Sequence, residues 1–173
     1  MELGTIITGI ILLLVFVLPI VLLNQKRAKD GKQFSSELFD FALKNHCKIS
    51  EHEFWNNSAL GLDKETHQLY FIKNAVNHKI KLKIDLLEIQ KCRIVNTNRN
   101  IKYKGENHNV IDKLELAFIS RDKSKPEVFM EFYNTDVNNA TLSGELQLIE
   151  KWFKIINEQL ARITQENHKV QLA

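Results

Sequence analysis

The sequence has few of the residues that build common chemical sites. Its 173 residues include only two cysteines, two prolines and six scattered glycines. There is no CxxC pair, no GxSxG motif and no glycine-rich phosphate loop, so zinc-ribbon proteins, α/β-hydrolases and P-loop enzymes have no support. The two cysteines suit a reducing compartment, and a Cys47–Cys92 disulfide is expected only if the domain lies outside the cytosol. The sequence therefore predicts a non-enzyme without a cofactor.

A strong excess of charge of one sign is also missing. Glu2 is the only charged residue before Asn24; without it, 20 of the 21 acidic residues remain, against 24 basic ones. This mixture lacks the dense basic stripe with interleaved aromatic residues that nucleic-acid binding requires. We expect no nucleic-acid partner.

The feature that stands out is the apolar run 3–23. Sixteen of its twenty-one residues are Leu, Ile, Val or Phe, and none is charged. As a helix it would be about 31 Å long, close to the ~30 Å hydrocarbon core of a bilayer. A cleaved signal peptide would have a basic start, a shorter apolar stretch and a small-residue cleavage site. The sequence therefore predicts an uncleaved transmembrane helix over residues 3–23, with contact to the lipid bilayer and, through Gly4 and Thr8, a possible weak homodimer.

The linker 24–33 is basic. It contains Lys26, Arg27, Lys29 and Lys32, and basic residues are retained on the cytoplasmic side. We therefore expect a single-pass protein of the inner (plasma) membrane with its N-terminus outside and its C-terminal domain in the cytosol. The alternative is an envelope-facing structural protein with the same domain in the reversed orientation. The four basic side chains are also candidate contacts to anionic headgroups.

The remaining residues predict an α+β domain over residues 34–166, followed by a frayed tail, 167–173. A helix is expected near 35–45, since Phe34, Leu38, Phe41 and Ala42 share one face. Period-two alternation then predicts six or seven antiparallel strands, with loops at 96–100 and 105–109. The apolar stripe of 142–164 predicts a long C-terminal amphipathic helix that packs on the sheet.

This element order resembles that of small bacterial pleckstrin-homology-like (PH-like) domains. The likeness is carried by Leu60-Gly61-Leu62-Asp63 with Leu69-Tyr70-Phe71-Ile72, and by Ile84-Asp85-Leu86-Leu87-Glu88-Ile89 leading into Cys92-Arg93-Ile94-Val95. It covers roughly residues 50–165. The resemblance implies an antiparallel barrel closed by the C-terminal helix, and a domain that binds phosphoinositides, peptides or proteins. The loop 63–68 has as many acids as bases, which favours a protein partner over a phosphoinositide, and we expect this partner to be a membrane protein.

Two groups of residues are candidate sites. Lys79, Lys81 and Lys83 share one strand face and are either solvated or able to contact an anionic membrane surface. His46, Cys47, Glu51, His52 and Glu53 are potential metal ligands, but their spacing matches no zinc motif, and a solvated loop is favoured. The combined prediction is a membrane-anchored, non-catalytic binding or scaffold module, with an envelope-facing protein or a peripheral anionic-lipid-binding domain as alternatives.

Overall fold

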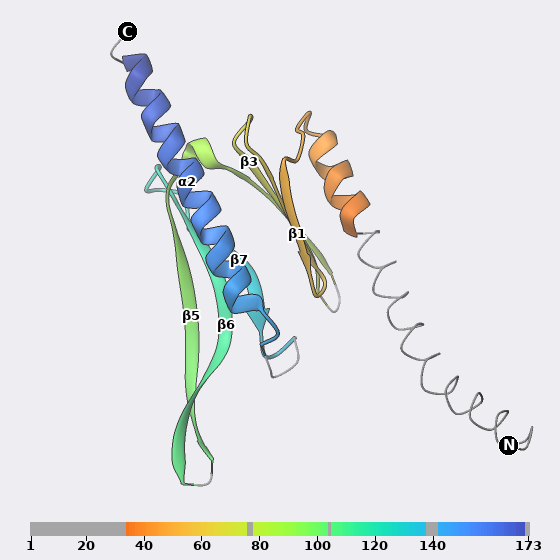
Figure 1. Cartoon of the computed structure of the whole chain (residues 1–173), viewed down its shortest axis with the longest axis vertical. Coiled ribbons are helices and arrows are strands. Elements are labelled where there is room, and N and C mark those ends of the chain that lie inside the picture. The colour runs from red at the N-terminus through yellow and green to blue at the C-terminus, as the bar shows by residue number, and fades with distance from the viewer. Residues whose placement is uncertain (1–33, 76–77, 104, 138–141, 172–173) are drawn as a thin grey trace, which may run out of the picture.

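The computed structural model describes residues 34–75, 78–103, 105–137 and 142–171 (Figure 1). A helix over residues 34–43 is followed by seven strands and a long helix, α2. The strands form two antiparallel sheets, of order β1-β2-β3-β4 and β5-β6-β7. The bounds are β1 Glu51–Trp55, β2 Ser58–Asp63, β3 Gln68–Asn74, β4 Lys79–Asp85, β5 Ile89–Tyr103, β6 Glu106–Ser120, β7 Val128–Asn134 and α2 Glu145–Gln171, with a short 3-10 helix η1 at Leu86–Glu88.

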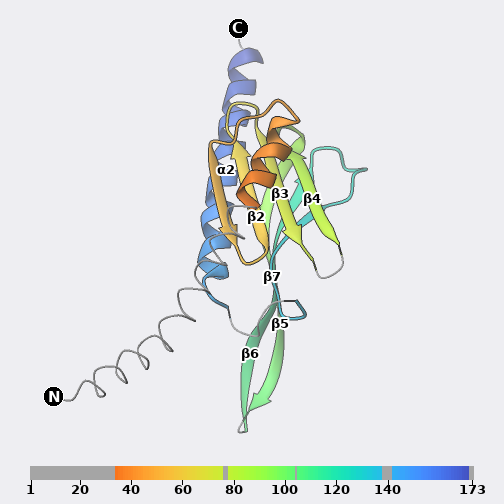
Figure 2. The same ribbon diagram turned by 90° about the vertical axis from the view of Figure 1, so that its right-hand side faces the viewer.

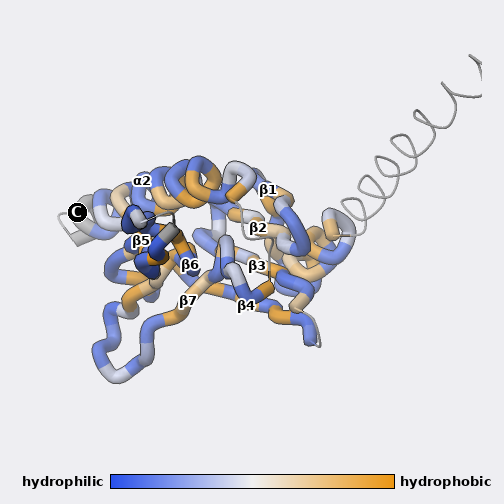
Figure 3. Tube along the Cα trace, turned by 90° about the horizontal axis from the view of Figure 1, so that it is seen from below, coloured by the Kyte–Doolittle hydropathy of each residue, from blue (hydrophilic) through white to orange (hydrophobic). Residues whose placement is uncertain are grey.

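The main hydrophobic core lies between the two sheets and α2. Apolar side chains alternate along each strand, so every second residue of β2, β3 and β6 points into this core. On α2, the buried residues recur every three or four positions and form one apolar stripe, which is Ile149, Trp152, Ile156, Leu160 and Ile163. Figure 3 shows α2 lying along one side of both sheets.

A second, smaller core lies on the opposite face of the four-stranded sheet. There the helix 34–43 packs Phe34, Leu38 and Ala42 against Ala59 and Tyr70. Strands β2 and β3 are therefore covered on both faces, and all six residues of β2 are buried. Gly61 permits this close packing, because a Cβ atom there would lie 2.8 Å from Ile49 Cδ1 and 3.1 Å from Leu38 Cδ2.

Strands β5 and β6 are much longer than the other strands. Each has 15 residues, which corresponds to about 50 Å of extended chain. Strand β7 pairs with β6 only from Lys113 to Phe118. The distal parts of β5 and β6 therefore project beyond the body as a two-stranded ribbon, visible in Figures 1 and 2. We call residues 98–111 the arm.

The structure corrects the predicted fold class. The α+β class holds, but the described strands form two separate sheets of four and three strands and no closed barrel. The predicted PH-like barrel closed by the C-terminal helix is therefore wrong. The loops expected at 96–100 and 105–109 are also wrong, because most of these residues belong to β5 and β6.

The predicted membrane topology is corrected as well. The expected span, residues 3–23, lies outside the described residues, as does the linker 24–33. Among the residues that the structure does describe, no helix is both long and apolar enough to cross a bilayer. This finding contradicts the predicted transmembrane helix, the single-pass topology and the inner-membrane location.

Candidate functional site

The three lysines of β4 lie beside the helix 34–43 and contact it or the turn that follows it. Lys79 Nζ lies 2.5 Å from Glu37 Oε2, and Lys83 Nζ donates to Asn45 Oδ1 at 3.1 Å. Lys81 Nζ sits 5.6 Å from the centre of the Phe41 ring, within range of a cation–π interaction.

The contacts between the three lysines and the helix follow from the similar spacing of residues along a strand and along a helix. Alternate residues of a strand are about 6.6 Å apart, and residues four apart on a helix are about 6 Å apart along its axis. A strand parallel to a helix can therefore place each second residue against each fourth residue, as at 79, 81, 83 and 37, 41, 45. The lysines thus have partners within the chain, although membrane contact through them stays a prediction. Lys26, Arg27, Lys29 and Lys32 lie outside the described residues.

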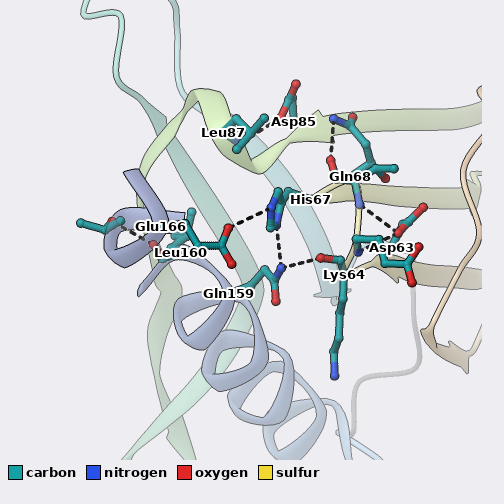
Figure 4. Close-up of polar contacts among 12 residues, drawn as sticks. Asp63, Lys64, His67, Gln68, Asp85, Leu87, Gln159, Leu160 and Glu166 are labelled. Atoms are coloured by element: carbon teal, nitrogen blue, oxygen red, sulfur yellow. Dashed lines mark hydrogen bonds and ion pairs between the residues drawn. The ribbon is translucent and has the colours of Figure 1, made fainter. Parts of the chain in front are cut away.

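A polar cluster joins the β2–β3 turn to α2 (Figure 4). Gln159 is buried, and its Nε2 donates to the Lys64 carbonyl oxygen at 2.9 Å and lies 2.7 Å from His67 Nδ1. The other ring nitrogen of His67 lies 3.7 Å from Glu166 Oε2. Since Gln159 bonds the Lys64 carbonyl oxygen and lies against His67, this cluster holds the turn on the helix.

Asp63 stabilises the same β2–β3 turn through hydrogen bonds to backbone N–H groups. Its carboxylate accepts hydrogen bonds from the backbone N–H groups of Lys48 at 2.7 Å, Glu65 at 3.0 Å and Thr66 at 3.1 Å. Burial raises the pKa of Asp63, but these hydrogen bonds outweigh burial and leave the pKa below its ordinary value. This carboxylate holds a turn in place, because all three donors belong to the chain around it.

The hypothetical metal ligands do not form a metal site. Among the described residues, no group of three or more His, Cys, Asp or Glu side chains is placed to hold a metal ion. Cys47 is buried, with its Sγ 3.3 Å from the Asn45 carbonyl oxygen and 3.4 Å from Thr66 Oγ1. Cys92 is also a free, buried thiol, and burial raises its pKa to about 12.

A groove of about 480 Å³ lies between the end of β1 and the start of α2. Its aromatic wall is Trp55, which stacks on Phe132 with ring centres 4.6 Å apart and donates its indole N–H to the Phe132 carbonyl oxygen. Glu145 accepts from Asn56 Nδ2 at 2.8 Å, and Lys151 pairs with Glu53 at 2.5 Å. These groups bind one another, so the groove lacks convergent polar groups that would define a ligand.

A smaller cavity of about 230 Å³ lies between β4 and the β6–β7 loop. Its walls are mainly apolar, with Ile84, Phe118 and Val128 among them. At its rim, Lys125 pairs with Glu88 at 2.7 Å.

The arm differs from all of these features because its side chains face solvent. Residues 96–102 and 105–109 are exposed. At its base, Arg99 Nε lies 3.0 Å from Asp112 Oδ1, and beyond that pair β5 and β6 have no further strand partner among the described residues. Both outer edges of the ribbon therefore carry backbone N–H and C=O groups without a strand partner in the described part of the chain.

One face of the arm is rich in asparagine. The register pairs Asn98 with Ile111, Asn100 with Asn109, and Lys102 with Asn107. Directly opposed residues share a face, so the carboxamides of Asn98, Asn100, Asn107 and Asn109 lie on the same side. Asparagine is a poor strand former, and these four residues are exposed. Their strand conformation is thus not explained by packing within the chain.

Only a weak signal for the arm is present in the sequence. Residues 96–109 are polar and rich in Asn, a composition that is typical of loops. The one feature that indicates a hairpin is Gly105, whose φ of 86° suits a tight turn between Tyr103 and Glu106.

Comparison with known proteins gives no match. No protein-family model matches the sequence, and neither a curated protein nor a solved structure does so. The PH-like resemblance and its implied functions therefore gain no support from relatives.

Proposed function

We propose that the chain is a non-catalytic binding and scaffold module, and that the arm is the element that contacts its partner. The observation that supports this proposal is that residues 98–102 and 105–109 of the arm are exposed on both faces, and that no described strand pairs with either outer edge there. An isolated two-stranded ribbon is marginally stable in water, whereas an added strand or a packed face stabilises it. A partner that pairs with an edge of the arm or packs on one of its faces would supply this stabilisation, which the body of the protein does not provide.

The rest of the molecule fits a rigid base for such an arm. The proximal halves of β5 and β6 belong to the main core through Cys92, Leu114 and Leu116, which are at most 1% exposed. Helix α2 packs on β5, β6 and β7. The arm therefore continues from two strands whose proximal parts are anchored in the main core.

Photocrosslinking in cells tests this proposal. A photoreactive amino acid at Asn107, on the arm, is compared with the same amino acid at Lys123, an equally solvent-facing position in the β6–β7 loop. We expect discrete adducts from position 107 and few from position 123. Equal adduct patterns from both positions, or adducts from position 123 alone, would contradict the proposal.

A shortened arm gives the matching stability control. Replacing residues 99–110 by Asn-Gly joins Asn98 to Ile111 by a two-residue turn and keeps the Asp112 carbonyl, which accepts from Thr135 N–H at 2.9 Å. Because the removed side chains are mostly exposed, the free energy of unfolding should change by less than about 1 kcal/mol. If the shortened chain does not fold, the arm is a structural element and the proposal fails.

A further inference from the structure

The outer edge of β5 is the more accessible edge of the arm. Strand β5 is the terminal strand of its sheet, so no described strand pairs with this edge. On the β6 side, the Thr135 N–H bonds to the Asp112 carbonyl oxygen at 2.9 Å and limits the open edge to Glu106–Ile111. Among the described residues, no backbone hydrogen bond limits the outer edge of β5 within the arm in this way.

The hairpin geometry indicates which backbone groups of β5 point outward. Tyr103 pairs with Glu106 across two connecting residues, and the pair that flanks a two-residue turn is hydrogen-bonded. Hydrogen-bonded and non-bonded pairs then alternate along the ladder. Asn98, Asn100 and Lys102 fall in the non-bonded positions, so their N–H and C=O groups face away from β6.

This edge is complementary to itself. If a second β5 runs antiparallel to the first about a two-fold axis at Asn100, then Asn100 faces Asn100, Asn98 faces Lys102, and Arg99 faces Ile101 of the other copy. No like charges are directly opposed in this register. An axis at Arg99 would instead oppose the two guanidinium groups, which is unfavourable.

We propose that two copies of the chain associate through their arms, by antiparallel pairing of the outer edges of β5 about a two-fold axis at Asn100. This inference rests on the proposed function of the arm and names its partner as a second copy. Three residues of each copy, Asn98, Asn100 and Lys102, exchange backbone hydrogen bonds with the other. The two isolated ribbons become one four-stranded sheet, which meets the requirement for more than two strands.

Disulfide trapping tests the register directly. In a hydrogen-bonded antiparallel pair, opposed Cα atoms are about 5.5 Å apart, within the range that a disulfide bridges. The full-length Asn100→Cys variant should therefore form a covalent dimer under mild oxidation. Asn109→Cys is the matched control, because Asn109 is the exposed residue directly opposite Asn100 on the other edge of the same ribbon. Equal trapping at both positions, or trapping at Asn109 alone, would overturn the assignment to β5.

Proline variants test the hydrogen bonds without a new covalent link. Asn100→Pro removes an outward N–H and no bond to β6, so two intermolecular hydrogen bonds are lost per dimer. We expect sedimentation to show a dimer dissociation constant raised at least about tenfold. Asn109→Pro alters the other edge in the same way and should leave the dissociation constant unchanged. A dimer that is insensitive to Asn100→Pro would refute the pairing.

Charge changes at Asn98 test which residues are opposed. Asn98→Glu would face Lys102 of the other copy and tighten the dimer several-fold, whereas Asn98→Lys would weaken it by a similar factor. Equal effects of the two variants would overturn the register. If the wild-type chain stays monomeric while position 107 still yields adducts with a different protein, the second-copy inference fails and the proposed function of the arm survives.

Discussion

The β2–β3 hairpin and the arm are both antiparallel strand pairs, yet they relate to the rest of the molecule in opposite ways. The β2–β3 hairpin is covered on one face by the main core and on the other by the helix 34–43, so nearly all its residues are buried. The arm is exposed over residues 98–102 and 105–109. The comparison shows two different roles of a strand pair. Burial stabilises the β2–β3 hairpin, whereas the arm is available for contact with a partner. We expect substitutions to affect stability in one hairpin and association in the other.

The largest effect should follow from truncating the buried hairpin. Phe71 on β3 is 1% exposed, and its ring centre lies 5.9 Å from that of Trp55. Phe71→Ala leaves a cavity between the sheets and should reduce the free energy of unfolding by about 3–5 kcal/mol. Urea denaturation followed by tryptophan fluorescence measures this loss. Ile101→Ala on the arm is the control, with an expected change in the free energy of unfolding of under about 0.5 kcal/mol. A loss at Ile101 as large as that at Phe71 would contradict the difference between the two hairpins.

An intermediate effect is expected at the ion pair that joins the two sheets. Lys73 on β3 is 5% exposed, and its ammonium contacts the Glu131 carboxylate on β7. Lys73→Met should lower the free energy of unfolding by about 2 kcal/mol, which is less than the loss expected for an isolated buried ion pair. The loss is smaller because Glu131 keeps two other partners, Lys113 Nζ at 3.5 Å and Asn134 Nδ2 at 2.9 Å. The double variant Lys73→Met with Glu131→Leu should recover much of this loss, as measured by chemical denaturation. Additive losses would show that the pair is not coupled.

The difference in burial between the two hairpins also explains why the sequence predicts one of them and not the other. Leu60, Leu62 and Phe71 occur in apolar runs because two packed faces require apolar side chains at a regular period, so β2 and β3 can be predicted. The α2 stripe is predictable for the same reason. Residues 98–102 and 105–109 of the arm are exposed, so no apolar pattern marks them, and the asparagines indicate loops instead.

Two other features depend on distant contacts that periodicity does not encode. Sheet closure depends on whether strand edges far apart in the sequence pair, and this is why the predicted barrel was wrong. The alternation of Lys79, Lys81 and Lys83 correctly marks one strand face. It does not indicate that Glu37 and Phe41 pack beside that face, since this contact needs the placement of another element.

A smaller, pH-dependent effect is expected at the start of α2. Glu145 is 4% exposed and accepts hydrogen bonds from Asn56 Nδ2 and from Ser143 N–H, so it ties the β1–β2 turn to the helix. Burial raises the pKa of Glu145, but these hydrogen bonds outweigh burial and leave the pKa lowered. The stabilisation is therefore complete above the unfolded pKa of 4.5 and is lost as the pH falls through the lower folded value.

Glu145→Gln should accordingly cost about 1–2 kcal/mol at pH 7 and progressively less below pH 4.5. Urea denaturation at several pH values measures the difference. Glu150→Gln, an exposed residue of the same helix, should show little change at any pH. A Glu145→Gln loss that is constant from pH 7 to the acid limit would mean that the charge is not what stabilises the junction.

The smallest effect, and the one of opposite sign, is expected on the arm itself. Asn100 and Asn109 are directly opposed and exposed, and threonine is the better strand former at such a pair. The double variant Asn100→Thr, Asn109→Thr should stabilise the ribbon locally by up to about 1 kcal/mol. Hydrogen exchange at high dilution should then slow in the arm, while the free energy of global unfolding stays the same because the core is untouched. If exchange in the arm is already as slow as in β2 and β3, or if global stability falls with the substitution, then the arm is held by the body of the protein and the distinction between the two hairpins does not stand.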